Sequence, residues 1–539
     1  MNWMVNLIRS RSRASLAGTR PAREPSRRGR HLAIEPLEGR TLLSLSSFFS
    51  GLFPSFKSTT TATPKQFVKL LNDPPNVSYP PYKIFTEVAN LNDPGSTGQL
   101  FNSKILVDGY APPFAAVWLA YGTTGYFTTV TRADKAGYFV LLATVPQGTL
   151  LIRTFAESLD KAYSDVNSIT VNYSNSIVAW DALALRAIQD SHLSAEEATR
   201  DLAILHTAQY DAVAAATNPK SAFAVQATAQ PGASPTAAAN AAAEAVLLAL
   251  FPSYATAFTK ASIAGTAGAK LTPAELKGAS LGAEVAQKTL ATRANDGSAI
   301  TTTNGAIGLN PNWSQVKPFV LTSASEFRPA APPMAGTSAF DQALSEVAAL
   351  GRSTSTNRTA DQTAAALYWD DPVGSSTTAG HWNTIAEQFA IARKTNLLAT
   401  ARAFAQLDVA LADAAIASAD AKVTYAVPRP ITTIQRTDPT WTPLLATPGT
   451  PSYVSQHAAI AAAASDILSA TYGKTTRFTA AAPNSTPANT RTFKSFAAAA
   501  TEDATSRVYG GVSYRFDTTA GLSLGDSAGK AVLANFPKK

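Results

Sequence analysis

The chain has 539 residues, of which 45% are hydrophobic and 15% are charged, a balance typical of globular rather than disordered proteins. Because this length exceeds what one compact core usually holds, we expect two or more domains. The absence of cysteine excludes disulfides, thiolate metal ligands and cysteine nucleophiles. The five histidines form neither an HxxxH nor an HExxH pattern, so the sequence predicts no clustered zinc site.

The net charge of +8 is concentrated at the N-terminus. Nine arginines and three glutamates give residues 1–40 a charge of +6, so the other 499 residues share only +2. A basic tail on a nearly neutral body is not typical of a nucleic-acid-binding surface, and we expect no nucleic-acid partner. No run of 18 apolar residues occurs, so the sequence predicts no transmembrane helix.

The basic tail has the features of a targeting segment. It is rich in arginine and serine and continues into residues 34–44, which resemble an export-associated motif of certain bacterial extracellular proteins. We therefore expect residues 1–60 to form an export-associated segment without regular structure. The protein is expected to be secreted, or exposed at the cell surface.

Residues 75–175 have the composition of a β-rich domain. Short runs of β-forming residues are separated by Gly, Pro and Asp, which predicts a β-sandwich. The expected strands are 103–108, 115–121, 126–131, 138–143, 150–156 and 168–172. The strings Val107-Asp-Gly-Tyr-Ala-Pro-Pro and Ala133-Asp-Lys-Ala-Gly-Tyr-Phe-Val resemble a bacterial immunoglobulin-like domain. The resemblance implies a spacer or adhesive module, since no chemistry is visible there.

Residues 177–539 change to alanine-rich segments with helical periodicity. Alanine favours helices and lets them approach closely, so we expect a large all-α bundle. The expected helical segments are 198–216, 234–250, 273–295, 338–350, 361–369, 382–421, 455–471 and 492–509. The predicted fold is thus multidomain, with a β-sandwich followed by a helical domain.

Three basic residues near the C-terminus stand in positions suited to an anion. Lys422 ends a long helical pattern, Arg429 follows after six residues, and Arg507 lies in the last turn of a predicted helix. Ser455 is the predicted N-cap of another helix, whose unpaired N–H groups and positive dipole end attract anions. Arginine forks bind tetrahedral oxyanions, and His457 at this helix start is suited to exchange protons near neutral pH.

The spacing of these residues resembles a known signature. Lys422-(six residues)-Arg429-Pro430, Ser455-Gln456-His457 and Ser506-Arg507 are similar to the three-part motif of the vanadium haloperoxidase and type 2 phosphatidic acid phosphatase superfamily. Upstream strings such as Trp180-Asp-Ala-Leu-Ala-Leu and His381-Trp-Asn resemble its bacterial haloperoxidase-like branch. The resemblance extends over residues 177–537.

The resemblance implies a role for each matched residue. Lys422, Arg429 and Arg507 would neutralise the oxygens of vanadate or phosphate, while Ser455 and Gln456 would donate hydrogen bonds to the anion. His457 would be the acid–base group. With bound vanadate, such a site oxidises a halide or an organic acceptor with hydrogen peroxide.

Two positions depart from the family pattern. Gln456 replaces a glycine, so a larger side chain stands at the edge of the anion site. Ser513 replaces the histidine that is the axial vanadium ligand in haloperoxidases and the phosphorylated nucleophile in phosphatases. A serine oxygen is a poor neutral ligand and an unactivated nucleophile unless a base such as His457 serves it.

These departures leave three functions open. The first is a vanadate-dependent haloperoxidase, weakened by Ser513, with hydrogen peroxide and halide as substrates. The second is a phosphate-ester hydrolase of the acid-phosphatase type, which suffers more from the missing nucleophile. The third, close in rank to the first, is a catalytically silent relative that binds an oxyanion or acts as a scaffold. The resemblance also leaves a homodimer open.

Overall fold

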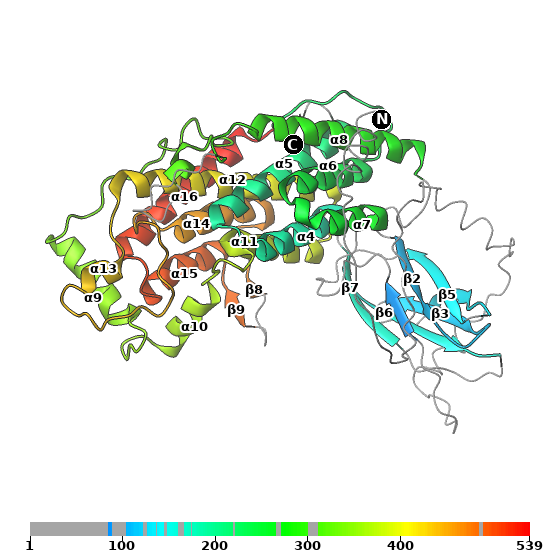
Figure 1. Cartoon of the computed structure of the whole chain (residues 1–539), viewed down its shortest axis with the longest axis horizontal. Coiled ribbons are helices and arrows are strands. Elements are labelled where there is room, and N and C mark those ends of the chain that lie inside the picture. Colours follow the sequence, from blue (N-terminus) through cyan, green and yellow to red (C-terminus); the bar gives the residue numbers. More distant parts are fainter. Residues whose placement is uncertain are drawn as a thin grey trace, which may run out of the picture. The chain divides into compact units, whose positions relative to one another are not determined.

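The computed structural model describes residues 85–88, 104–121, 127–135, 137–144, 148–159, 167–173, 175–218, 221–265, 271–299, 311–483 and 489–538. The expected export segment, residues 1–60, lies outside these residues. The described part of the chain contains strands first and helices afterwards (Figure 1). This order agrees with the change of composition near residue 177.

The N-terminal strands form two antiparallel sheets. They are β1 (Phe85–Val88), β2 (Lys104–Tyr110), β3 (Ala116–Tyr121), β4 (Phe127–Arg132), β5 (Tyr138–Thr144), β6 (Gly148–Glu157) and β7 (Asn167–Tyr173). One sheet has the order β1-β2-β5 and the other β4-β3-β6-β7. Val107, Val117, Leu119 and Phe139 are buried, as the alternating pattern requires. All six predicted strands are confirmed, β1 was not predicted, and the immunoglobulin-like character stays a prediction.

The rest of the described chain is a large helical domain, with one hairpin. Its helices are α4 (Ser176–Asp190), α5 (Ala195–Thr217), α6 (Pro235–Leu250), α7 (Ala255–Gly265), α8 (Pro273–Arg293), α9 (Ser338–Gly351), α10 (Ala360–Tyr368), α11 (Thr377–Ala392), α12 (Leu397–Tyr425), α13 (Pro430–Ile434), α14 (Gln456–Tyr472), α15 (Phe496–Tyr509) and α16 (Arg515–Asn535). Strands β8 (Phe478–Ala481) and β9 (Thr490–Phe493) form the hairpin. The predicted all-α architecture is therefore correct for most of this region.

Two predicted helical segments were wrong in detail. The expected helix 382–421 is two helices, because Lys394 adopts a φ of 50° after α11 and Asn396 then caps α12 by accepting from Ala399 N. The segment 492–509 begins as β9, and α15 starts only after its N-cap, Ser495. Local caps therefore override the continuous alanine-rich pattern.

The helix α12 is the centre of the domain. From Thr400 to Lys422 nearly all of its side chains are buried, and many of them are alanines. It packs against α5, α14 and α16, which surround it (Figure 1). The small side chains allow this close packing on all sides, and they fix the position of Lys422 near the C-terminal end of the helix.

Glycines set the distance between α14 and α16. A Cβ at Gly521 would collide with the carbonyl oxygen of Ser455, and one at Gly525 would collide with that of Ala459. The two helices therefore touch through their backbones, which only glycine permits. Because Ser455 begins α14, this contact also fixes the start of that helix.

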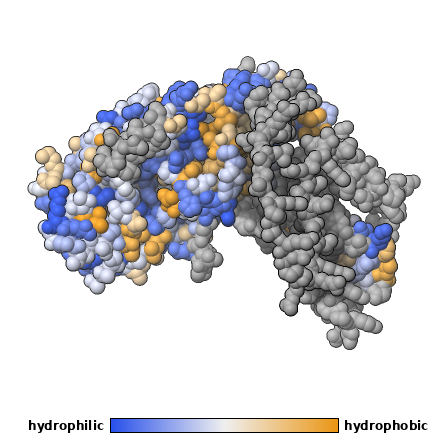
Figure 2. All heavy atoms as spheres, viewed as in Figure 1, coloured by the Kyte–Doolittle hydropathy of each residue, from blue (hydrophilic) through white to orange (hydrophobic). Residues whose placement is uncertain are grey.

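Outside the bundle's core, the surface is mixed. Hydrophilic and hydrophobic residues alternate over the visible face of the helical domain (Figure 2). Among the described residues, no helix is both long and apolar enough to cross a membrane.

A Gly525→Ala variant tests the backbone contact. The added methyl group must displace α14, so we expect a loss of about 1–3 kcal/mol in the free energy of unfolding. Chemical denaturation of this variant measures the loss. Ser523→Ala, at an exposed position of the same helix, is the control and should remain near wild type. Equal stability of both variants would contradict the glycine contact.

A cluster of ionisable side chains lies inside the bundle. His206 Nδ1 lies 2.6 Å from Asp408 Oδ2, and its Nε2 lies 3.6 Å from Asp181 Oδ1. Asn383 Nδ2 donates to Asp408 Oδ1 at 2.7 Å. Burial raises the pKa of Asp181 and of the neighbouring Glu387 carboxyl well above their ordinary values. These two carboxyl groups therefore keep protons that they lose in the unfolded chain.

This cluster predicts a pH-dependent stability. A carboxyl whose pKa is raised by folding stabilises the fold below about pH 4, and the stabilisation is lost as the pH rises towards the folded-state value. Glu387→Gln imitates the protonated form, so the melting temperature of this variant relative to wild type should rise between about pH 4 and pH 8. Glu284→Gln, on the surface, should show no such gain. Parallel pH profiles for Glu387→Gln and wild type would refute the prediction.

Candidate active site

All seven residues singled out in the sequence line one cavity of about 470 Å³. They come from α12, the start of α13, the start of α14, the end of α15 and the loop before α16, and they are Lys422, Arg429, Ser455, Gln456, His457, Arg507 and Ser513. Up to 91 residues of sequence separate them. The fold therefore brings the predicted site together, as the spacing of the motif requires.

The start of α14 forms one wall of this cavity. Ser455 is the N-cap and its hydroxyl accepts from Ala458 N at 3.4 Å, which confirms the predicted cap. Its own N–H donates to the carbonyl oxygen of Asp517 at 3.0 Å. The amide nitrogen Nε2 of Gln456 is buried in the cavity wall with no hydrogen-bond partner among the described residues. A buried unpaired donor is costly, so this amide points to a ligand with acceptor oxygens.

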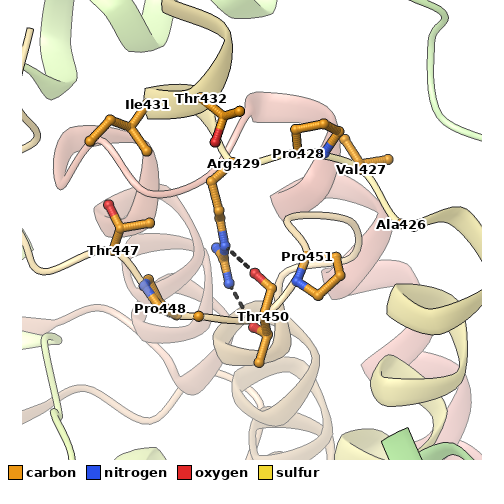
Figure 3. A pocket seen from close by; sticks show the side chains of 11 residues that line it. Ala426, Val427, Pro428, Arg429, Ile431, Thr432, Thr447, Pro448, Thr450 and Pro451 are labelled. Carbon is orange, nitrogen blue, oxygen red and sulfur yellow. Dashed lines mark hydrogen bonds between the residues drawn. The ribbon is translucent and has the colours of Figure 1, made fainter. Parts of the chain in front are cut away.

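Arg429 lies between two cavities. Its Nε and one terminal nitrogen donate to the carbonyl and hydroxyl oxygens of Thr450, at 2.7 and 2.9 Å (Figure 3). The other terminal nitrogen donates to Val512 O at 2.7 Å and lies 3.4 Å from the Ser513 hydroxyl. Arg429 also lines a second cavity of about 360 Å³, together with Ile431 and Thr447 (Figure 3). The guanidinium is thus held rigidly by backbone groups before any ligand arrives.

The other two cations also contact backbone carbonyls. Lys422 Nζ donates to Pro451 O at 2.6 Å, and Arg507 donates to Trp369 O at 3.1 Å. Asp370 is the nearest carboxylate to Arg507, at 3.8 Å. Carbonyl oxygens orient a cation without neutralising its charge, and the carboxyl groups of Glu196, Asp370 and Asp371 line the same cavity.

Burial of these cations shifts their protonation equilibria. Burial lowers the pKa of Lys422 well below its ordinary value, that of Arg429 to about 10, and that of Arg507 in the same direction. Arg429 lowers the pKa of Lys422 further, because like charges repel. A bound anion would offset both the loss of solvation and the repulsion from Arg429. Anion binding and full protonation of Lys422 therefore favour each other.

His457 is held by two side chains from other helices. Its Nδ1 lies 3.3 Å from Asp503 Oδ1, and the Thr378 hydroxyl lies 3.2 Å from both ring nitrogens. Trp382 Nε1 fixes Asp503 from behind at 3.2 Å. Burial and then Arg507 lower the pKa of His457 well below its ordinary value. The lowered pKa differs from the sequence prediction that His457 exchanges protons near neutral pH. The sequence does not show that His457 is buried and surrounded by cations.

Ser513 stands where the resemblance implies the axial histidine. The residue is 2% exposed and its N–H lies 3.3 Å from Arg507 O. Its hydroxyl has Arg429 as its neighbour, and none of the hydrogen bonds of His457 goes to it. Ser513 therefore lies at the anion site but has no general base at hydrogen-bond distance.

The sequence analysis missed other residues of the cavity wall. Glu196, Asp370, Thr377, Thr378 and Thr447 also line it. The hydroxyl oxygens of Thr377 and Thr447 are buried without a partner among the described residues, as is the Gln456 amide. No spacing rule marks these residues, because they come from three separate segments. No group of three or more His, Asp or Glu side chains in the described part of the chain could hold a metal ion.

Anion-dependent stability tests the cavity. An anion at about ten times its Kd stabilises the native state by about 1.4 kcal/mol, so phosphate or vanadate should raise the melting temperature of wild type. Arg507→Ala should lose this response, because it removes one of three converging cations. Arg515→Ala, whose side chain pairs with Glu346, is the control and should keep it. An equal response in wild type and Arg507→Ala would overturn the site.

Comparison with known proteins bears on the helical domain. Residues 402–538 match the family of the VCPO second helical-bundle domain. No curated protein matches the sequence. The solved structure of a bacterial vanadium-dependent iodoperoxidase has a TM-score of 0.61 and 26% identity, over 67% of this chain and 97% of that chain.

Two further structures share the fold at lower identity. The holo and apo forms of a bacterial vanadium-dependent chloroperoxidase both have a TM-score of 0.52 and 15% identity. They cover 64% and 63% of this chain and 94% of their own. The helical domain of this chain therefore has the fold of the bacterial vanadium haloperoxidases, and the matches support its place in their superfamily.

Proposed function

We propose that the helical domain is a vanadate-dependent haloperoxidase-like site, weakened by Ser513. The observation that carries the proposal is the convergence of Lys422, Arg429 and Arg507 on one cavity. Buried charges of one sign repel one another unless a counter-ion is bound. The cavity is thus suited to a tetrahedral oxyanion such as vanadate.

The residues present fit the oxygens of vanadate better than its metal centre. The unpaired amide of Gln456 and the N–H groups at the start of α14 are donors that match anionic oxygens. Ser513 offers a neutral oxygen where a nitrogen ligand would be expected. When bound, vanadate would supply the activation of hydrogen peroxide for oxidation of a halide or an organic acceptor.

The chain's own residues divide the remaining work. Lys422, Arg429 and Arg507 would bind and orient the anion and compensate negative charge that develops during reaction. His457, held by Asp503, would accept or donate a proton at the cavity. Because burial and the nearby cations lower its pKa, His457 is neutral near neutral pH and begins as a proton acceptor.

The second candidate is a silent oxyanion-binding relative. It is favoured by Ser513, which removes the covalent anchor and leaves the electrostatic contacts intact. A phosphate-ester hydrolase is less well supported, because Ser513 contacts Arg429 and no base that could activate it. Vanadate titration with and without peroxide and bromide separates an active site from a binding site.

We also propose the domain roles that the sequence predicts. Residues 1–60 would direct export, 75–175 would be an immunoglobulin-like spacer, and 177–539 would carry the oxyanion site. A homodimer is a further proposal. Fractionation of expressing cells and the mass of the purified protein in solution test export and assembly.

Restoring a histidine tests the haloperoxidase proposal. Ser513→His places an imidazole beside Arg429, so vanadate affinity and bromide-dependent peroxidase activity should both rise above wild type. Ser513→His with Gln456→Gly removes the larger side chain as well, and the two effects should not be additive because both touch one ligand. Vanadate titration and a bromination assay measure both changes.

Ser523→His on the exposed side of α16 is the matched control and should leave both quantities unchanged. Strong vanadate-dependent turnover by wild type would show that Ser513 suffices. Tight vanadate binding without turnover in any variant would favour the silent relative.

A further inference from the structure

One wall of the cavity carries a carboxylate that the proposed function does not use. Glu196 is the second residue of α5 and lines the same cavity as Lys422 and His457. It is only 8% exposed, although it lies in the first turn of a helix. Its charge acts on Lys422, which places it within electrostatic range of the cationic wall.

The Glu196 carboxylate has no bonded partner among the described residues, unlike the other acids nearby. Glu197 beside it closes the capping box of α5 by accepting from Ser194 N at 2.9 Å. Asp371 Oδ1 lies 3.0 Å from His381 Nδ1, and Asp370 lies 3.8 Å from Arg507. Glu196 is thus a buried acceptor whose oxygens remain free to meet a ligand.

A free carboxylate beside an anion site is unfavourable for most anions. An ionised carboxylate only accepts hydrogen bonds, so it repels an oxyanion unless that anion presents an O–H group to it. Phosphate and vanadate retain a proton near neutral pH, whereas sulfate does not. Three cations attract all of these anions by charge, so charge alone does not discriminate among them.

We propose that Glu196 selects protonated oxyanions by accepting a hydrogen bond from their O–H group, and that it rejects sulfate. This inference rests on the oxyanion site of the proposed function and names the class of anion that the site takes. The capping box of α5 fixes the turn that carries Glu196.

Glu196→Gln tests the selection. Glutamine has the same shape but is neutral and offers an N–H donor beside its carbonyl oxygen. It therefore weakens the charge-assisted bond to a protonated oxygen, removes the repulsion of sulfate and can donate to a sulfate oxygen. Calorimetric titration of the full chain with phosphate and with sulfate should show a clear preference for phosphate in wild type. The ratio of the two affinities should fall about tenfold in Glu196→Gln, the order expected for one charge-assisted hydrogen bond.

Glu197→Gln is the matched control. It removes the same charge from the same helical turn, and its amide oxygen can still close the capping box, so the ratio should remain that of wild type. Melting of each variant without added anion checks that it is folded.

The two proposals fail in different ways. If wild type binds phosphate and sulfate equally, or if Glu196→Gln keeps the wild-type ratio, the role of Glu196 is overturned while the oxyanion site stands. If folded wild type binds neither phosphate nor vanadate, the oxyanion site itself fails and Glu196 loses its ligand. An equal fall of the ratio in Glu197→Gln would assign the effect to net charge and overturn the hydrogen bond.

Discussion

Three cationic side chains are buried in one place, where they repel one another, and the surrounding parts of the helical domain hold them there. Lys422 is fixed by the buried helix α12, Arg429 by the Thr450 backbone, and Arg507 by Trp369 O. Carbonyl oxygens hold the cations in position without cancelling their charge, and Asp517 and Glu196 offset part of the repulsion at Lys422. Burial and then repulsion from the same cations lower the pKa of His457. Anion binding at the cavity and proton transfer by His457 therefore depend on the same three cations.

Much of the fold and site is encoded locally, and this part could be predicted from sequence. The N-cap Ser455 and the end of α15 near Arg507 follow from cap and helix rules that act over a few residues. The strands of residues 104–173 follow from alternation and turn residues. The convergence of Lys422 with Arg507 came from the resemblance to a known motif, because no local rule brings distant segments together.

The remainder depends on packing that a single sequence does not reveal. A break between α11 and α12 depends on Lys394 and Asn396, which the alanine-rich pattern conceals. Asp503 lies four residues before Arg507 on one helix, so its place beside the site could have been found from helical spacing. Glu196 could not, since an acid in a first helical turn is ordinarily a surface residue that complements the dipole. Only its burial in the cavity wall distinguishes it.

The backbone contact between α14 and α16 has a consequence for how this site can change. Ser455 belongs to one helix, and Ser513 lies two residues before the other, while Gly521 leaves no space for the helices to shift. The start of α14 and the position of Ser513 are therefore held in fixed register. A substitution at residue 513 therefore changes the side chain that faces the start of α14 without changing the spacing between the two helices.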